Sequence, residues 1–267
     1  MDISVIKIGG NVIDHPEKST QFLKLFSKFP GQKILVHGGG VMASRIGLSL
    51  GIEPKMHLGR RITDKETLDL VTMVYAGLIN KNLVAELYTY GQQAIGLTGA
   101  DGNAIRSHKR PVKGGVDYGY VGDVDQVHTE LLESLLQQSI APVFSAITHD
   151  GKGQLLNTNA DTIASEIATA LAKKHKVNLY FCFDKTGVLM DASNEASLIP
   201  LINDDIYKEL IRDQVIHSGM IPKLENAFKA LNKGVNHVWL GLPESLLLAS
   251  KGKNAGTIIE SQKYGLY

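Results

Sequence analysis

Short apolar runs of β-type residues alternate with helical patterns along this chain, and the alternation limits the possible folds more than any other feature. Residues 3–8 and 33–37 are two such runs, and each is followed by glycines and then by a helical pattern. Strands that alternate with helices form a mainly parallel sheet with helices on both faces. The sequence therefore predicts an α/β fold, a three-layer sandwich around one central, mainly parallel sheet.

The same alternation continues to the C-terminal part of the chain. Further strands are expected at residues 93–97, 121–127, 140–145, 177–183 and 237–241. Further helices are expected at residues 17–29, 41–50, 159–173, 203–212 and 222–233. We place a boundary near Lys173, so that two lobes, 1–173 and 174–267, share one continuous sheet.

Local signals predict how several elements begin, end and turn. Thr63 and Glu66 form a capping-box pattern for a long helix that ends at Gly91, and Asn159 is the expected N-cap of the helix after it. The pairs Gly114-Gly115 and Asp150-Gly151 are typical of hairpin turns. We therefore expect the sheet to be mixed at one edge.

The charge and cysteine content argue against several classes of protein. Lys and Arg total 28 and Asp and Glu total 27, which gives a formal net charge of +1. A chain so balanced has no general field to attract nucleic acid or an anionic membrane, and we expect neither as a partner. The single Cys182 cannot form an internal disulfide, and no signal peptide or apolar span is visible. These features predict a cytoplasmic protein.

Two of the expected strands end in glycine clusters, at residues 7–10 (KIGG) and 37–40 (HGGG). Glycine lets backbone N–H groups approach an anion closely, and a helix N-terminus adds partial positive charge. Loops at the ends of parallel strands lie at one edge of a sheet, where ligands usually bind. Lys7 is costly in an apolar strand unless it faces a ligand or lies on the wet face of an edge strand. Together the clusters favour a phosphate site, although either loop alone could be a tight turn.

A dinucleotide site is the competing interpretation of the second cluster. Gly38-x-Gly40-x-x-Ala43 loosely matches the dinucleotide fingerprint directly after a strand. That interpretation needs an acidic residue at the end of the next strand, and Pro54 disrupts a central strand there. The chain also lacks the P-loop sequence and the motif set of protein kinases.

Five segments of this chain, in family order, resemble the amino acid kinase family. They are the two glycine clusters and residues 59–64 (GRRITD), 156–161 (LNTNAD) and 218–223 (SGMIPK). The last three resemble most the branch of the family that acts on N-acylated glutamate. The resemblance implies an amino acid kinase-like sandwich, in which the N-terminal lobe binds the acyl amino acid and dimerises and the C-terminal lobe binds ATP.

The resemblance also implies roles for individual residues. The catalytic residues would be Lys7, Lys223 and Asp161. The substrate-binding residues would be Gly38, Gly39, Arg61 and Asn157, with Arg60 beside them. The nucleotide-binding residues would be Gly9, Gly10, Asp184 and Gly187. No protein ligand to a metal is expected, since Mg²⁺ would be held mainly by the phosphates of ATP and by water.

The implied reaction uses ATP and Mg²⁺ and a small-molecule substrate, an N-acylglutamate. The first expectation is N-acetylglutamate, converted to an acyl phosphate in arginine biosynthesis. A carboxylate is already ionised at neutral pH, so this nucleophile needs no general base. Catalysis then reduces to alignment and charge compensation around the transferred phosphoryl group. His37 is accordingly expected to be structural.

Two other interpretations stay open at this point. Arg60 stands where the family usually has an apolar residue, so N-succinylglutamate or another carboxylate is an alternative substrate. A catalytically silent, effector-binding subunit is an alternative of a different class, and the presence of Lys7, Lys223 and Asp161 argues against it. The resemblance further implies a homodimer. Since the first strand begins near Ile3, the helix that builds arginine-sensitive hexamers in relatives is not expected, and neither is inhibition by arginine.

Overall fold

An eight-stranded sheet forms the centre of the molecule in the computed structural model, which describes residues 1–57, 59–112, 114–216, 220–253 and 255–261. The strand order is β12-β14-β13-β11-β1-β2-β8-β5. In chain order these strands are β1 (Asp2–Ile8), β2 (Gln32–His37), β5 (Ala94–Leu97), β8 (Ala141–Ser145), β11 (Lys176–Cys182), β12 (Leu201–Ile202), β13 (His237–Gly241) and β14 (Thr257–Ile259). Every neighbouring pair is parallel except β13 and β14, which are antiparallel.

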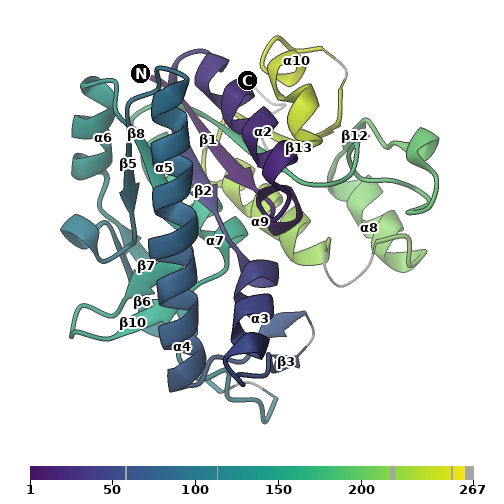
Figure 1. The fold of residues 1–267 in the computed structure, drawn as a ribbon. Coiled ribbons are helices and arrows are strands. Elements are labelled where there is room, and N and C mark those ends of the chain that lie inside the picture. Colours follow the sequence, from purple (N-terminus) through teal and green to yellow (C-terminus); the bar gives the residue numbers. More distant parts are fainter. Residues whose placement is uncertain (58, 113, 217–219, 254, 262–267) are drawn as a thin grey trace.

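Helices cover both faces of this sheet, so the expected three-layer α/β fold is confirmed. Figure 1 shows α2 and α5 in front of the sheet and α7 behind it, and α7 packs on α9. The α-helices are α1 (Gly10–Ile13), α2 (Pro16–Lys28), α3 (Gly40–Ser49), α4 (Lys65–Thr72), α5 (Asn80–Thr89), α6 (Thr129–Gln137), α7 (Ala160–Ala172), α8 (Asp204–Arg212), α9 (Ile221–Asn232) and α10 (Leu246–Ala249). Short 3₁₀ turns lie at Asp101–Asn103, Glu195–Ser197 and Pro243–Ser245.

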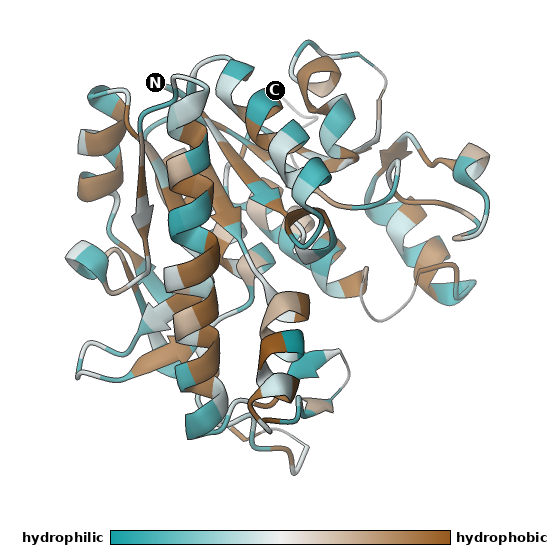
Figure 2. Ribbon diagram, in the orientation of Figure 1, coloured by the Kyte–Doolittle hydropathy of each residue, from teal (hydrophilic) through white to brown (hydrophobic). Residues whose placement is uncertain are grey.

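The core lies on both faces of the central strands. In β1 the side chains of Ile3, Val5, Ile6 and Ile8 are fully buried, as a strand covered by helices on both sides requires. Figure 2 shows hydrophobic residues concentrated in these central strands. Lys7 is also buried within β1, and a buried charge needs a partner.

Strands from the two halves of the chain lie side by side in the middle of the sheet. β1 pairs in parallel with β11, from Asp2 opposite Lys176 to Ile8 opposite Cys182. The sheet is therefore continuous across residue 173. The division into two lobes at that residue stays a prediction.

The hairpin turns belong to a second sheet, which corrects the expectation that they make an edge of the main sheet antiparallel. This four-stranded sheet has the order β10-β9-β6-β7. Its strands are β6 (Ile105–Lys109), β7 (Gly122–Val127), β9 (Ile147–His149) and β10 (Leu155–Asn157). Turn residues indicate that two strands pair, but not which sheet they join. The antiparallel edge of the main sheet is formed by β13 and β14 instead.

The segment before α4 differs from the expectation by one residue. Asp64 is the N-cap of α4, and its Oδ1 accepts a hydrogen bond from the backbone N–H of Thr67 at 3.0 Å. Thr63 cannot serve as the cap because its backbone pairs with Tyr118 and Tyr120 in an extended segment. α4 continues through a π-helical turn, Met73–Ile79, into α5, and Gly91 follows its end as expected.

Two further features complete the fold. A small hairpin that the sequence did not predict pairs β3 (Met56–His57) with β4 (Arg60–Arg61). Asn159 is the N-cap of α7, as expected, and its Oδ1 accepts from the backbone N–H of Thr162 at 3.0 Å. Within the described ranges, no helix combines the length and the apolar character needed to cross a membrane.

Candidate active site

Two glycine loops lie side by side where β1 and β2 end, as the sequence predicts. Ile8 and His37 are in register in neighbouring strands, and the glycines that follow them line a cavity of about 790 Å³. Gly39 has a φ of 153°, a conformation that L side chains rarely adopt. A Cβ at this position would collide with Ile79 and lie 3.0 Å from Tyr75. Close packing against Ile79 and Tyr75 and the positive φ therefore both require a glycine at position 39.

Inside the cavity, one carboxylate is shared by two lysines from different elements. Asp161, in the first turn of α7, lies 2.8 Å from Nζ of Lys7 in β1 and 3.0 Å from Nζ of Lys223 in α9. The Lys223 contact has hydrogen-bond geometry, whereas the Lys7 contact is an ion pair without it. The three side chains are only 11%, 16% and 10% exposed for Lys7, Asp161 and Lys223. Three segments far apart in sequence thus meet at one charged centre.

The two lysines keep Asp161 ionised. Burial by itself would raise the pKa of Asp161, but the charges of Lys223 and Lys7 outweigh it and hold the pKa below its usual range. Burial also lowers the pKa of Lys223, which the Asp161 carboxylate partly restores. The Lys223 ammonium lies 5.4 Å and 5.5 Å from the ring centroids of Phe181 and Phe183. The centre carries one surplus positive charge, which suits it to bind an anion.

Arg61 and Asn157 line the same cavity beyond the second glycine loop. Nη2 of Arg61 donates to the carbonyl oxygen of Gly40 at 2.9 Å and to Oγ of Ser44 at 2.7 Å. Nδ2 of Asn157 donates to Oγ1 of Thr63 at 3.0 Å. These bonds fix both side chains and leave further donors of the guanidinium for a ligand.

The opposite side of the cavity is formed by residues that follow β11 and begin α9. Asp184 accepts a hydrogen bond from Nδ2 of Asn11 at 2.9 Å, which joins the first glycine loop to this side. Gly187 lies outside the cavity wall, and a Cβ there would come 2.6 Å from Oγ1 of Thr257. Packing explains this glycine, and its role in nucleotide binding stays a prediction. Ser218 and Gly219 of the 218–223 segment lie outside the described residues.

Every candidate site residue predicted from the sequence lies at this cavity, except Gly187. They are Lys7, Gly9, Gly10, Gly38, Gly39, Arg60, Arg61, Asn157, Asp161, Asp184 and Lys223. His37 does not line it. The His37 ring is fully buried, lies 3.0 Å from Nδ2 of Asn80, and burial lowers its pKa to about 4. His37 is therefore neutral and structural.

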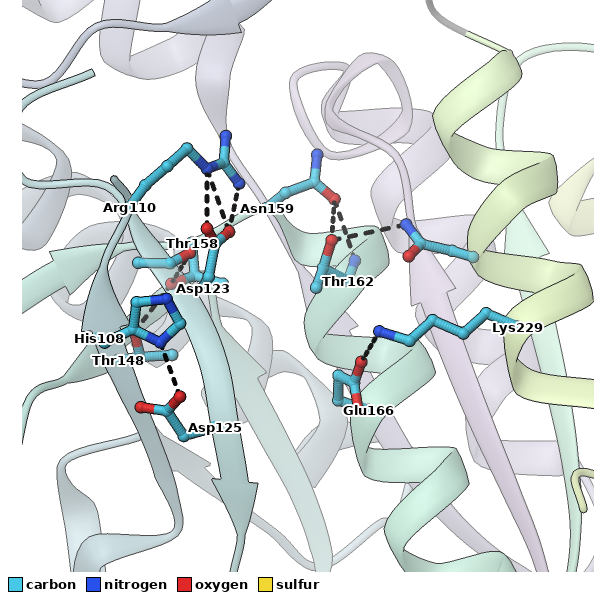
Figure 3. Close-up of polar contacts among 12 residues, drawn as sticks. His108, Arg110, Asp123, Asp125, Thr148, Thr158, Asn159, Thr162, Glu166 and Lys229 are labelled. Atoms are coloured by element: carbon cyan, nitrogen blue, oxygen red, sulfur yellow. Dashed lines mark hydrogen bonds and ion pairs between the residues drawn. The ribbon is translucent and has the colours of Figure 1, made fainter. Parts of the chain in front are cut away.

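Asn11, Ser44 and Arg110 are among the polar residues of the cavity wall that sequence reasoning missed. Ser44 stands four residues after Gly40 on α3, so helical spacing could have placed it on the same face. Arg110 forms a bidentate pair with Asp123 in Figure 3, with its Nη2 2.6 Å from Oδ1. No motif marks Arg110, because only the pairing of β6 with β7 brings Asp123 beside it.

A family comparison agrees with this fold and site. Residues 2–241 match the model of the amino acid kinase family. The chain belongs to that family.

Individual proteins and solved structures are also similar to this chain. A protein named acetylglutamate kinase from Cytophaga hutchinsonii is 55% identical over 254 residues, which cover 95% of this chain and 96% of that protein. One of the same name from Phocaeicola vulgatus is 51% identical over 258 residues, which cover 97% and 98%. Among solved structures, smu.665 from Streptococcus mutans UA159 is 28% identical with a TM-score of 0.77, covering 96% of this chain and 98% of that one.

Proposed function

We propose that this protein transfers the γ-phosphoryl group of ATP to the γ-carboxylate of N-acetylglutamate, as a step of arginine biosynthesis. The observation that carries the proposal is the pair of lysines held on Asp161 inside a glycine-lined cavity. The two relatives that are 51–55% identical over nearly the whole chain carry the name acetylglutamate kinase, which supports the same substrate.

In the proposed step, an oxygen of the γ-carboxylate attacks the γ-phosphorus while the bond from that phosphorus to the bridging oxygen breaks. The products are an acyl phosphate and ADP, and no proton has to be removed from the nucleophile. Lys7 and Lys223 compensate the negative charge of the transferred group, and Asp161 fixes the positions of both ammonium groups. This arrangement allows two anions to approach each other.

The remaining contacts divide between the two substrates. Arg61 and Asn157 hold the amino-acid substrate, and the backbone N–H groups of Gly38 and Gly39 face its reacting carboxylate. Gly9, Gly10 and Asp184 serve the nucleotide, with Gly187 shaping the loop behind them. In this arrangement the N-terminal lobe, 1–173, binds the acyl amino acid and the C-terminal lobe, 174–267, binds ATP.

Mg²⁺ would bind at this site together with ATP. Both carboxylate oxygens of Asp161 are already engaged by ammonium groups. In the part of the chain that the structure describes, no three His, Cys, Asp or Glu side chains are grouped to hold a metal ion. Mg²⁺ commonly binds substrate phosphates and retains several waters, and it would neutralise phosphate charge here. We propose that phosphate oxygens and water hold it.

We also propose a cytoplasmic homodimer. β5 ends the order of the main sheet, and Ile95 is exposed on it. The neighbouring long helix exposes Met73, Leu78 and Tyr88. Large exposed apolar side chains on adjacent elements favour an interface with a second copy. Light scattering should give the mass of a dimer, and a monomer at micromolar concentration would refute this proposal.

A coupled ADP-release assay tests the activity. ATP and Mg²⁺ are supplied with N-acetylglutamate, N-succinylglutamate, glutamate, aspartate or carbamate, and hydroxylamine traps the acyl phosphate. Turnover with an N-acylglutamate supports the proposal. Turnover only with a free amino acid or with carbamate would show that the proposed substrate is wrong and that the compound turned over is the substrate instead. ATP binding without turnover of any compound would favour the silent, effector-binding subunit.

A further inference from the structure

Arg60 is an arginine at the cavity that has no partner among the described residues. Arg60 lines the cavity and is exposed to solvent. Its side chain forms no ion pair or hydrogen bond with the residues that the structure describes. The neighbouring Arg61 is engaged by Gly40 and Ser44. The two arginines are adjacent in sequence, but hydrogen bonds hold the Arg61 side chain in place and none holds that of Arg60.

The hairpin geometry indicates which side of β4 Arg60 faces. Residues opposite each other in an antiparallel pair share one face, and Arg60 is opposite His57. The His57 ring contacts the Tyr118 ring edge-on, with 6.0 Å between the centroids. The guanidinium carbon of Arg110 lies 5.5 Å from the centroid of the same Tyr118 ring. Arg60 thus shares a face of the hairpin with His57, and the Tyr118 ring lies against both His57 and Arg110.

Arg110 is held in place but keeps free donors. Its Nε and Nη2 bond to Asp123, whereas Nη1 has no partner within the described residues, and Figure 3 shows this nitrogen pointing away from Asp123. The side chain is 17% exposed and lines the cavity. A bidentate pair of this kind fixes the guanidinium plane, so the remaining nitrogen is presented to a ligand without loss of freedom.

Backbone pairing fixes how far Arg110 lies from the substrate-binding side chains. The N–H of Arg110 donates to the carbonyl of Val121, and Val121 bridges to Asn157. Arg110 and Asn157 are therefore two strand spacings apart, roughly 10 Å. Arg110 therefore lies in the wall of the same cavity as Asn157 but at some distance from it, where it can contact a different group of the ligand.

We propose that Arg60 and Arg110 form a second anion subsite, which receives the acyl group of the substrate and selects acyl chains that end in a carboxylate. This inference rests on the proposed phosphoryl transfer to an N-acylglutamate, and it changes the favoured acyl group from acetyl to dicarboxylic acyl groups, of which N-succinyl is the shortest common example. A methyl group offers nothing to two guanidinium groups, whereas a carboxylate accepts charge-assisted hydrogen bonds from both. N-acetylglutamate fits the same cavity but leaves this subsite without a partner.

The test compares kcat/KM for N-succinylglutamate, N-acetylglutamate and N-butanoylglutamate, which has the succinyl chain length without its charge. The wild type should prefer N-succinylglutamate over both others by about tenfold or more, the usual value of a charge-assisted hydrogen bond. Arg60→Leu should remove most of this preference, and Arg60→Lys should retain part of it. Arg110→Lys keeps a cation for Asp123 but loses the forked donor, and should also reduce the preference.

Arg106→Leu is the matched control, because Arg106 bonds to Gln126 on the same small sheet but does not line the cavity. It should leave the ratio of the two kcat/KM values unchanged. Equal rates for N-succinylglutamate and N-butanoylglutamate, or equal effects of Arg60→Leu on all three substrates, would overturn the inference and leave the proposed function standing. Turnover of none of the three would refute both.

Discussion

The centre and the rim of the cavity are built in opposite ways. At the centre, Lys7, Asp161 and Lys223 come from a central strand and two packed helices, are at most 16% exposed, and are paired with one another. At the rim, Arg60 lies in a strand of two residues and is exposed. The centre is fixed before any ligand binds, whereas the Arg60 side chain at the rim has no partner among the described residues to fix it.

Because of this difference, the centre determines the type of reaction and the rim determines which substrate is preferred. A buried charge that loses its partner is costly, so the centre tolerates little change. An exposed arginine can be replaced at small cost in stability, because surface ion pairs contribute little. Substrate preference can therefore vary at the rim while the phosphoryl-transfer centre stays the same.

The largest expected effect comes from removing a lysine at the centre. Lys7→Ala and Lys223→Ala should each lower kcat by about 10²–10³ with the fold retained, because each ammonium group stabilises the transferred phosphoryl group. Asp161→Ala should also lower kcat strongly, since both ammonium groups then lose their fixed positions. Steady-state kinetics and circular dichroism check both parts of this prediction.

Lys229→Ala is the matched control for Lys223→Ala. Lys229 is also on α9 and pairs with Glu166 of α7 at 2.6 Å (Figure 3). Neither residue lines the cavity. Removal of the Lys229 side chain should leave kcat within about twofold, since the pair lies outside the cavity. Activity of the Lys7 or Lys223 variant within a few-fold of the wild type would contradict the proposed mechanism.

A smaller effect is expected on stability at low pH, from His37 beneath the second glycine loop. Burial lowers the pKa of His37 from 6.5 to about 4, so the unfolded chain binds a proton there more readily than the folded protein. The free energy of unfolding should therefore fall as pH drops from 6.5 towards 4, by about 3 kcal/mol from this group. Urea unfolding of the wild type and of His37→Gln at several pH values measures this contribution.

The comparison with His37→Gln removes the contribution of other groups. His237, whose pKa burial also lowers, adds to the pH dependence of both proteins equally. His37→Gln is expected to be less stable at pH 7 but to lose less stability between pH 6.5 and pH 4. If both proteins lose the same amount over this range, His37 is not held neutral by burial.

Local signals in the sequence indicate where the centre lies, whereas the catalytic roles of its residues are implied by the family resemblance. Glycines directly after apolar strands, Lys7 within one of them, and Asp161 two residues after the N-cap Asn159 are all visible in short segments. The alternation of strands and helices then fixes the side of the sheet on which these segments meet. The resemblance to the family placed Lys223 at the same centre, and the structure brings it to 3.0 Å from Asp161.

The rim could not be predicted because it depends on pairing between distant segments. Arg110 acquires its orientation from Asp123, and the backbone of Thr63 pairs with Tyr118 and Tyr120, whose positions no local pattern indicates. The same pairing moved the cap of α4 from the expected Thr63 to Asp64. Short strands such as β3 and β4 carry too few residues for a periodic pattern to show.

The smallest predicted effect concerns that cap, in the segment that leads from the rim into α4. Asp64→Ala should lower the free energy of unfolding by about 1 kcal/mol at pH 7, the usual value of an N-cap. Hydrogen bonds from the side chain and backbone N–H of Thr67 lower the pKa of Asp64 to about 2. A carboxylate with a lowered pKa stabilises the fold above its unfolded pKa of 3.8, and this contribution is lost as pH falls through 2.

The matched control is Asp64→Asn, which keeps an acceptor for the N–H of Thr67 but removes the charge. It should cost less than Asp64→Ala at pH 7, because asparagine is also a good N-cap. The difference in stability between the wild type and Asp64→Asn should shrink as pH falls from 4 towards 2, since over this range the unfolded wild type takes up a proton at Asp64 that the folded protein does not. Urea unfolding midpoints at pH 7, 4 and 3 measure both trends. Equal midpoints for all three proteins at pH 7 would mean that the cap does not stabilise α4, and that pairing of Thr63 with Tyr118 and Tyr120 alone fixes where the helix begins.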